Sequence, residues 1–210
     1  MFKFCPSCAS EKITFTDNKL FHCPNCGFHL YHNTAAATAC LISVTDPAIP
    51  GEQRILFLVR NKDPGKGKLD LPGGFVDPGE GAYECIYREL KEEIGWVPSI
   101  PVGSAVEFPA EPAEKTAGKP GTDLSGVFKL YASFPNLYPY KNIQYNTCDL
   151  FFFIEAPGLK EQDLRIEQSE ISEVRFLRPE EIDYSEIAFE SIKRGVRAFL
   201  NGFHSQSNCL

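Results

Sequence analysis

Three glutamates crowded near the end of one predicted helix are the residues best suited to chemistry in this chain. Glu89, Glu92 and Glu93 fall within an arc of about 100° when their segment is wound as an α-helix. Acids there disfavour the helix, because Glu89 and Glu93 repel each other at i,i+4 and the C-terminal end of a helix dipole favours cations. A bound cation would offset that cost. Oxygen ligands with room for water and phosphate predict Mg²⁺ or Mn²⁺.

A solvated surface helix rich in glutamate is the alternative interpretation, since charged side chains are mostly exposed. Arg88 also has two interpretations. It either forms a simple i,i+4 pair with Glu92 or orients a catalytic carboxylate. We favour the second interpretation of Arg88, and metal binding for the three acids, because a longer pattern surrounds them.

Residues 74–96 follow the pattern G-x5-E-x7-R-E-U-x-E-E-x-G-U, where U is a large apolar residue. Its seven fixed positions would coincide by chance in about one of 10⁸–10⁹ windows. This stretch resembles the signature of the Nudix hydrolases, and the resemblance extends over most of the chain. It implies a mixed-sheet α/β/α sandwich that cleaves the pyrophosphate of a nucleoside diphosphate linked to a group X. It assigns the cation ligands to Glu89, Glu92, Glu93 and the carbonyl of Gly73 or Gly74.

The resemblance also implies a carboxylate that removes the proton from a cation-activated water. In the family this base lies either in the signature or on a later loop. Glu92 and Glu93 are therefore candidates, with Arg88 as the orienting group. Glu170, just before the last predicted strand, is the later candidate, and Glu173 is its alternative. A solvated loop acid is the other interpretation of both later residues.

The substrate is expected to be ADP-ribose, FAD or a related dinucleotide. The chain resembles both the ADP-ribose and FAD pyrophosphatases and the NADH pyrophosphatases, some of which remove NAD caps from RNA. Residues 133–139, SFPNLYP, keep the serine and both prolines of the NADH subgroup's motif but lack its glutamine and tryptophan. NADH or NAD-capped RNA is therefore the alternative. A non-catalytic ligand sensor is a further alternative, against which the intact signature argues.

Aromatic residues beyond the signature are candidates for stacking on an adenine or flavin ring. They are Tyr131, Phe134, Tyr138 and Tyr140. Ordinary strand packing is the alternative for each of them.

Four of the eight cysteines form a second pattern, two C-x-x-C pairs separated by 14 residues: Cys5, Cys8, Cys23 and Cys26. This spacing predicts a structural tetrahedral Zn²⁺ site. A segment of about 30 residues has too little core to fold alone, so the metal would supply folding energy. A redox dithiol and disulfides are the alternatives. The ribbon either supports the structure or a dimer, or binds nucleic acid or a partner.

Among the other residues of these types, Cys40 and Cys148 are expected in the core because they lie in apolar runs. Cys85 and Cys209 show no metal-ligand spacing. The three histidines of the ribbon are interpreted as surface or packing residues: His22, His29 and His32.

The elements that must position these residues give an α+β organisation. Strands are predicted at 34–44, 54–60, 127–134, 147–154 and 173–177, a turn of helix at 179–182, and helices at 80–94 and 186–201. The first helix should bury Tyr83, Ile86, Tyr87, Leu90 and Ile94. Residues 107–126 are rich in proline and glycine and are interpreted as a lid loop. We divide the chain into a zinc ribbon, 1–33, and a Nudix hydrolase domain, 34–204.

Composition agrees with a soluble cytoplasmic enzyme, and the family resemblance implies a nucleotide-type small molecule as its substrate. The formal net charge of −7 argues against nucleic-acid binding through a basic surface, with capped RNA as the exception. The N-terminal residues contain no apolar run typical of a signal peptide, and no run of about 18 apolar residues predicts a membrane span. A homodimer is an expectation from the family resemblance.

Overall fold

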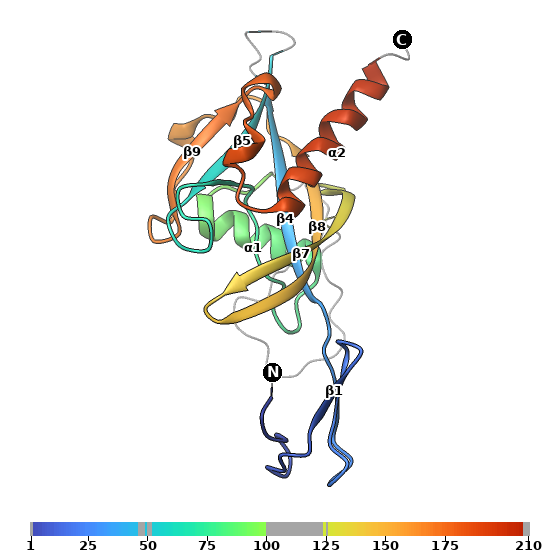
Figure 1. Cartoon of the computed structure of the whole chain (residues 1–210). Helices are drawn as coiled ribbons and strands as arrows, with labels where there is room; N and C mark the ends of the chain where they lie inside the picture. The colour runs from blue at the N-terminus through green and yellow to red at the C-terminus, as the bar shows by residue number, and fades with distance from the viewer. Residues whose placement is uncertain (1, 46–48, 50–51, 100–123, 125, 208–210) are drawn as a thin grey trace. The chain divides into compact units, whose positions relative to one another are not determined.

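The computed structural model describes residues 2–45, 49, 52–99, 124 and 126–207, with side chains described up to residue 202 (Figure 1). The chain divides into two compact units, Met1–Ala35 and Ala36–Leu210. Residues 100–123, most of the predicted lid, and Cys209 lie outside the described residues. Among the helices that are described, none is both long and apolar enough to cross a membrane.

The first unit is a small antiparallel sheet beside two cysteine pairs. Strands β1 (Thr14–Thr16), β2 (Leu20–His22) and β3 (His29–Tyr31) pair in chain order. Asp17 and Asn18 turn between the first two strands with positive φ angles of 51° and 55°, which these residue types tolerate. Phe21 is buried and stacks on Phe15 at 4.2 Å between ring centroids. So small an apolar cluster leaves the four cysteines as the main source of order.

The second unit is built on a six-stranded sheet whose main order is β6-β5-β4-β8-β7, with β9 paired to β5. Its strands are β4 (Ala35–Thr45), β5 (Gln53–Arg60), β6 (Leu69–Asp70), β7 (Lys129–Tyr140), β8 (Ile143–Glu155) and β9 (Ile171–Leu177). The sheet is mixed. The N–H groups of Ala156 and Gly158 bond to the carbonyls of Ser43 and Thr45 in the same chain direction, which is a parallel register, whereas the other pairs are antiparallel.

Two helices cover the two faces of this sheet. Helix α1 (Ala82–Ile94) buries Ile86, Leu90 and Ile94 against one face, as its apolar spacing predicts. Gly95 ends it with a left-handed φ of 63°. Helix α2 (Glu190–Ser207) packs on the other face. Three short 3₁₀ turns complete the unit, Glu161–Asp163, Pro179–Glu181 and Tyr184–Glu186. The predicted α/β/α sandwich is confirmed.

Several boundaries differ from the prediction. Helix α1 begins two residues late, because the Glu80 carboxylate accepts a hydrogen bond from the Asp77 N–H and belongs to the preceding loop. Helix α2 begins four residues late, after a 3₁₀ turn. Strands β7 and β8 continue to Tyr140 and from Ile143, forming a long hairpin. The prediction that Cys148 is a core residue is wrong, since Thr147 and Asp149 face inward and alternation along β8 leaves Cys148 exposed.

Candidate active site

A glycine loop lies between strand β4 and helix α1. The Thr38 N–H donates to the Gly74 carbonyl at 2.8 Å, and the Cys40 N–H donates to the Pro72 carbonyl at 2.8 Å. A methyl group at Gly73 would lie 2.1 Å from the Thr38 carbonyl oxygen, and Gly73 has a φ of 149°. Only glycine allows the loop to approach the strand this closely.

Arg88 fastens this loop to the helix. Its guanidinium donates to both oxygens of Glu80, at 2.8 and 3.0 Å, and to the Phe75 carbonyl at 3.1 Å. It also contacts Glu89 at 2.8 Å and Glu92 at 3.1 Å. Partial burial raises the pKa of Glu80, but the hydrogen bonds from Arg88 and the Asp77 N–H and the charge of Arg88 together outweigh burial, so the net effect is a lowered pKa of Glu80. Arg88 therefore forms the i,i+4 pair with Glu92 and contacts Glu89 as well.

The acids beside the loop repel one another. Burial raises the pKa of Glu93 well above its usual range, and the charges of Glu89, Asp70 and Glu170 add to the rise. One contact opposes it, since the Gly73 N–H donates to the Glu93 carboxylate at 2.9 Å. Burial likewise raises the pKa of Glu89, although the charge and hydrogen bond of the nearby Arg88 lower it in part. These carboxylates are therefore gathered at a place that favours a cation.

Glu170 reaches this cluster because the loop before β9 is fastened to the end of helix α1. The Glu167 N–H donates to the Glu93 carbonyl at 2.9 Å, and the Asn61 N–H donates to the Glu170 carbonyl at 2.7 Å. The Glu170 carboxylate pairs with Lys62 at 2.5 Å. Glu173, the alternative, is exposed and pairs with Arg175 at 3.0 Å, away from the cleft.

Glu89, Glu93 and Glu170 lie close enough for their charges to interact, and carboxylate oxygens are the donors that a hard divalent cation prefers. A backbone carbonyl would come from Gly73, because the Gly74 carbonyl accepts the bond from Thr38.

These acids line one part of a cleft of about 760 Å³ in the second unit. Its other part contains Tyr138, whose ring lies 5.4 Å from Phe75 and 5.3 Å from Phe189. Of the aromatic candidates, Tyr138 therefore lines the cleft.

The structure does not bring Tyr131 and Phe134 to this cleft. Both contact Phe151 in the core beneath helix α2, and the Tyr131 hydroxyl donates to the Gly195 carbonyl at 3.1 Å. Strand packing, the alternative interpretation, describes them. Tyr140 is exposed at the hairpin turn, also outside the cleft lining.

Several residues that line the cleft were not among the candidates predicted from the sequence. Arg60 and Asp70 form a buried ion pair at 2.6 Å, and Phe189 lies over the Arg60 guanidinium at 5.0 Å. Thr147 and Asp149 line the cleft from β8. For Asp149, the sequence offers one signal, an acidic residue inside the otherwise apolar segment 147–154.

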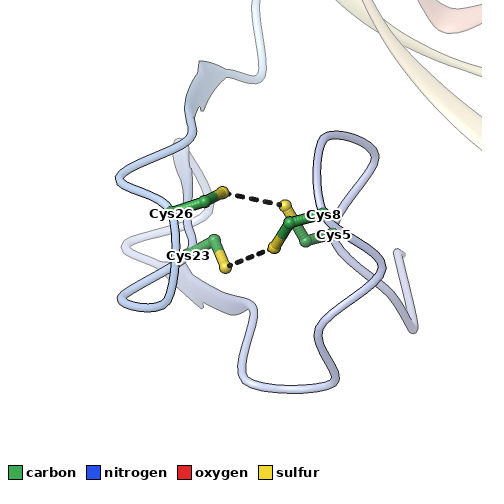
Figure 2. Close-up of side chains that lie close together, drawn as sticks. All are labelled: Cys5, Cys8, Cys23 and Cys26. Atoms are coloured by element: carbon green, nitrogen blue, oxygen red, sulfur yellow. Dashed lines mark hydrogen bonds between the residues drawn. The ribbon is translucent and has the colours of Figure 1, made fainter.

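The four predicted zinc ligands converge in the first unit, where their sulfur atoms all lie within 4.8 Å of one another (Figure 2). The Sγ atoms of Cys5 and Cys26 are 3.6 Å apart, and those of Cys8 and Cys23 are 3.7 Å apart. Tetrahedral Zn²⁺ with bonds of about 2.3 Å would separate its sulfur ligands by about 3.8 Å. The set therefore fits zinc.

The ionisation of these thiols also suits a metal. Hydrogen bonds from Asn25 and from the Ser10 backbone lower the pKa of Cys8 to about 6. A backbone bond from Phe28 favours the Cys26 thiolate, but Cys8, burial and the contacts with Cys5 and Cys23 together outweigh it and raise the pKa of Cys26 to about 11. A divalent cation would relieve this competition among thiolates.

Comparison with known proteins decides the family. The family model described as "NUDIX domain" matches residues 35–198. The chain belongs to the NUDIX domain family. This Nudix chain is 38% identical over 73 residues to the ADP-ribose pyrophosphatase of Methanocaldococcus jannaschii, covering 35% of the chain and 39% of the relative. It is 33% identical over 93 residues to the NAD-capped RNA hydrolase NudC of Chromobacterium violaceum, covering 44% of the chain and 32% of the relative.

The Nudix chain thus spans less than two fifths of the length of these curated relatives. Among solved structures, a NUDIX hydrolase from Nitrosomonas europaea superposes with a TM-score of 0.56 at 20% identity, covering 97% of this chain and 93% of that one. At this identity the likeness shows the fold alone.

Proposed function

We propose that this Nudix protein is a Mg²⁺- or Mn²⁺-dependent pyrophosphohydrolase that cleaves ADP-ribose, FAD or a related dinucleotide. The observation that carries the proposal is the gathering of Glu89, Glu93 and Glu170 beside the glycine loop, with raised pKa values for the first two. The likeness to an ADP-ribose pyrophosphatase supports the substrate class.

Each residue of the cluster takes a separate role in this proposal. Glu89, Glu93 and the Gly73 carbonyl hold the cations, and Glu92, whose side chain is 59% exposed, adjoins them. When bound, the cations would polarise the phosphoryl oxygens and lower the pKa of a water. Arg88 orients Glu89, and the Gly73 N–H orients Glu93.

Glu170 is the proposed general base, which accepts the proton of the attacking water. Its side chain is 40% exposed and lines the cleft, so water can reach it. The ion pair with Lys62 orients this carboxylate at the cleft.

NADH or NAD-capped RNA is the second candidate substrate, favoured by the likeness to an NAD-capped RNA hydrolase. We also propose that Cys5, Cys8, Cys23 and Cys26 hold a structural Zn²⁺, supported by their sulfur spacing.

The test is product release from ADP-ribose, FAD, NADH and NAD-capped RNA with Mg²⁺. Glu170→Gln should lower kcat by about 10²- to 10⁴-fold. Glu173→Gln is the matched control, because it makes the same change on an exposed side chain three residues away and should leave kcat unchanged. Equal losses in both variants would contradict the role of Glu170. A folded protein that hydrolyses none of the four would favour a ligand sensor.

A further inference from the structure

Asp149 is a carboxylate that lines the cleft and is buried. It is 7% exposed and lies on β8. Across the described part of the chain, no lysine, arginine or histidine nitrogen lies within the ion-pair distance of 4.0 Å. Its partner is the Thr147 hydroxyl, which donates at 2.6 Å and is itself buried. Asp70, another buried acid of the cleft, is paired with Arg60.

This arrangement leaves hydrogen-bonding capacity unused. A carboxylate can accept about four hydrogen bonds, and one hydroxyl supplies a single donor. Because Asp149 lines the cleft, a donor on a ligand can reach it without unfolding the strand.

The surroundings of Asp149 indicate what kind of ligand carries that donor. Tyr138 and Phe189, 5.3 Å apart, line the same cleft and offer ring surfaces. Asn136 lies opposite Thr147 in the β7–β8 register and lines the cleft too. Aromatic walls beside a polar group suit a flat heterocycle with donors on its edge.

We propose that Asp149 accepts a hydrogen bond from the amino group of an adenine-type base and so selects nucleotides that carry this group over those with a carbonyl in its place. The proposal rests on the proposed function, in which the cleft binds a nucleotide. A ribose hydroxyl is a donor of the same chemistry, and the experiment separates the two sources.

The experiment is calorimetric binding of AMP, IMP and 2′-deoxy-AMP, with Mg²⁺, to the full-length protein. IMP replaces the amino group with a carbonyl oxygen, which would face the carboxylate. The wild type should bind AMP about 10- to 100-fold more tightly than IMP, as expected for a hydrogen bond to a charged group. Asp149→Asn should bring this ratio close to one, since its amide can donate to the IMP oxygen. Glu155→Gln, the matched control at the exposed end of β8, should keep the wild-type ratio.

Three outcomes would overturn the proposal. The first is a wild type that binds AMP and IMP equally, a result that depends on no variant. The second is an Asp149→Asn protein that keeps its thermal transition and the AMP preference. The third is an effect of Asp149→Asn on the ratio of AMP to 2′-deoxy-AMP alone, which would assign the donor to the ribose.

Product binding also separates this inference from the proposed function. Asp149-dependent preference for AMP without hydrolysis of any dinucleotide would support the inference and reject the enzyme. Hydrolysis of ADP-ribose without a preference for AMP would support the proposed enzyme and reject the role of Asp149.

Discussion

Replacing Gly74 with alanine should disable the catalytic cluster without unfolding the protein. The new methyl group would lie 2.3 Å from Oε1 and 2.6 Å from Cδ of Glu89. Ordinary contact begins near 3.4 Å, so the carboxylate must move by roughly 1 Å. This movement disturbs the 2.8 Å contact between Glu89 and Arg88.

A displacement of about 1 Å at a catalytic centre costs about 10²-fold in rate. We therefore expect kcat/KM for the best dinucleotide to fall by about 10², or about 2.7 kcal/mol in the activation free energy. The thermal midpoint should change by less than about 4 °C, because the end of a side chain can move where backbone cannot. Steady-state kinetics and calorimetry measure the two effects.

Gly81→Ala is a matched control for this variant. Its methyl group would meet the Glu84 Oε2 at 2.3 Å, the same crowding, but Glu84 does not line the cleft. Its kcat/KM should stay within about twofold of wild type. A Gly74→Ala protein that also stays within about threefold of wild type, or an equal loss of activity in both variants, would contradict the role of Glu89 in the cluster.

Three further predictions concern stability. Gly73→Ala should lower the thermal midpoint by about 6 °C or more, because its methyl group meets the Thr38 carbonyl of the backbone at 2.1 Å; a midpoint within about 2 °C of wild type would contradict this. Glu93→Gln should stabilise the metal-free protein at pH 8 but not at pH 4, since a carboxyl with a raised pKa costs stability only as pH rises above its unfolded value of 4.5. Urea unfolding at both pH values tests it, and an equal difference at the two would be inconsistent with burial of that charge. Chelation of zinc should expose residues 14–31 to rapid amide exchange while helix α1 stays protected; loss of protection in both units would show that they unfold together.

Helix α1 could be predicted from the sequence because its information is local. Ile86, Leu90 and Ile94 repeat at helical spacing on one arc, and the acids occupy another. The zinc ligands could be predicted for the same reason, since each cysteine pair lies within one turn of chain.

The β7–β8 hairpin was underestimated because prolines interrupt its sequence. Pro135 and Pro139 look like turn residues, yet both lie within β7. Strand β7 is at the edge of the sheet, where a residue without an N–H group need not break a ladder. Edge position is a property of the whole fold and leaves no mark in the local sequence.

The part of the cleft around Asp149 could not be predicted for a similar reason. Its residues come from the ends of separate elements, with Arg60 on β5, Asp70 on β6 and Phe189 just before α2. No spacing pattern relates them. Tyr131 and Phe134 lie in the predicted strand 127–134, whereas Asn136 and Tyr138, the cleft residues of β7, lie beyond its predicted end. Phe134 shares a strand face with Asn136 and Tyr138, so position along the strand decides which of these three reach the cleft.

The charge of the cleft has a consequence for turnover in the proposed reaction. Among the described residues, eight carboxylates and three basic side chains line it. Hydrolysis of a dinucleotide replaces one pyrophosphate bridge, with about two negative charges, by two phosphomonoesters with up to about two each. A cleft of this sign repels the products more strongly than the substrate. The negative electrostatic field of the cleft therefore speeds the departure of both products. Because salt screens this field, higher ionic strength should slow product release.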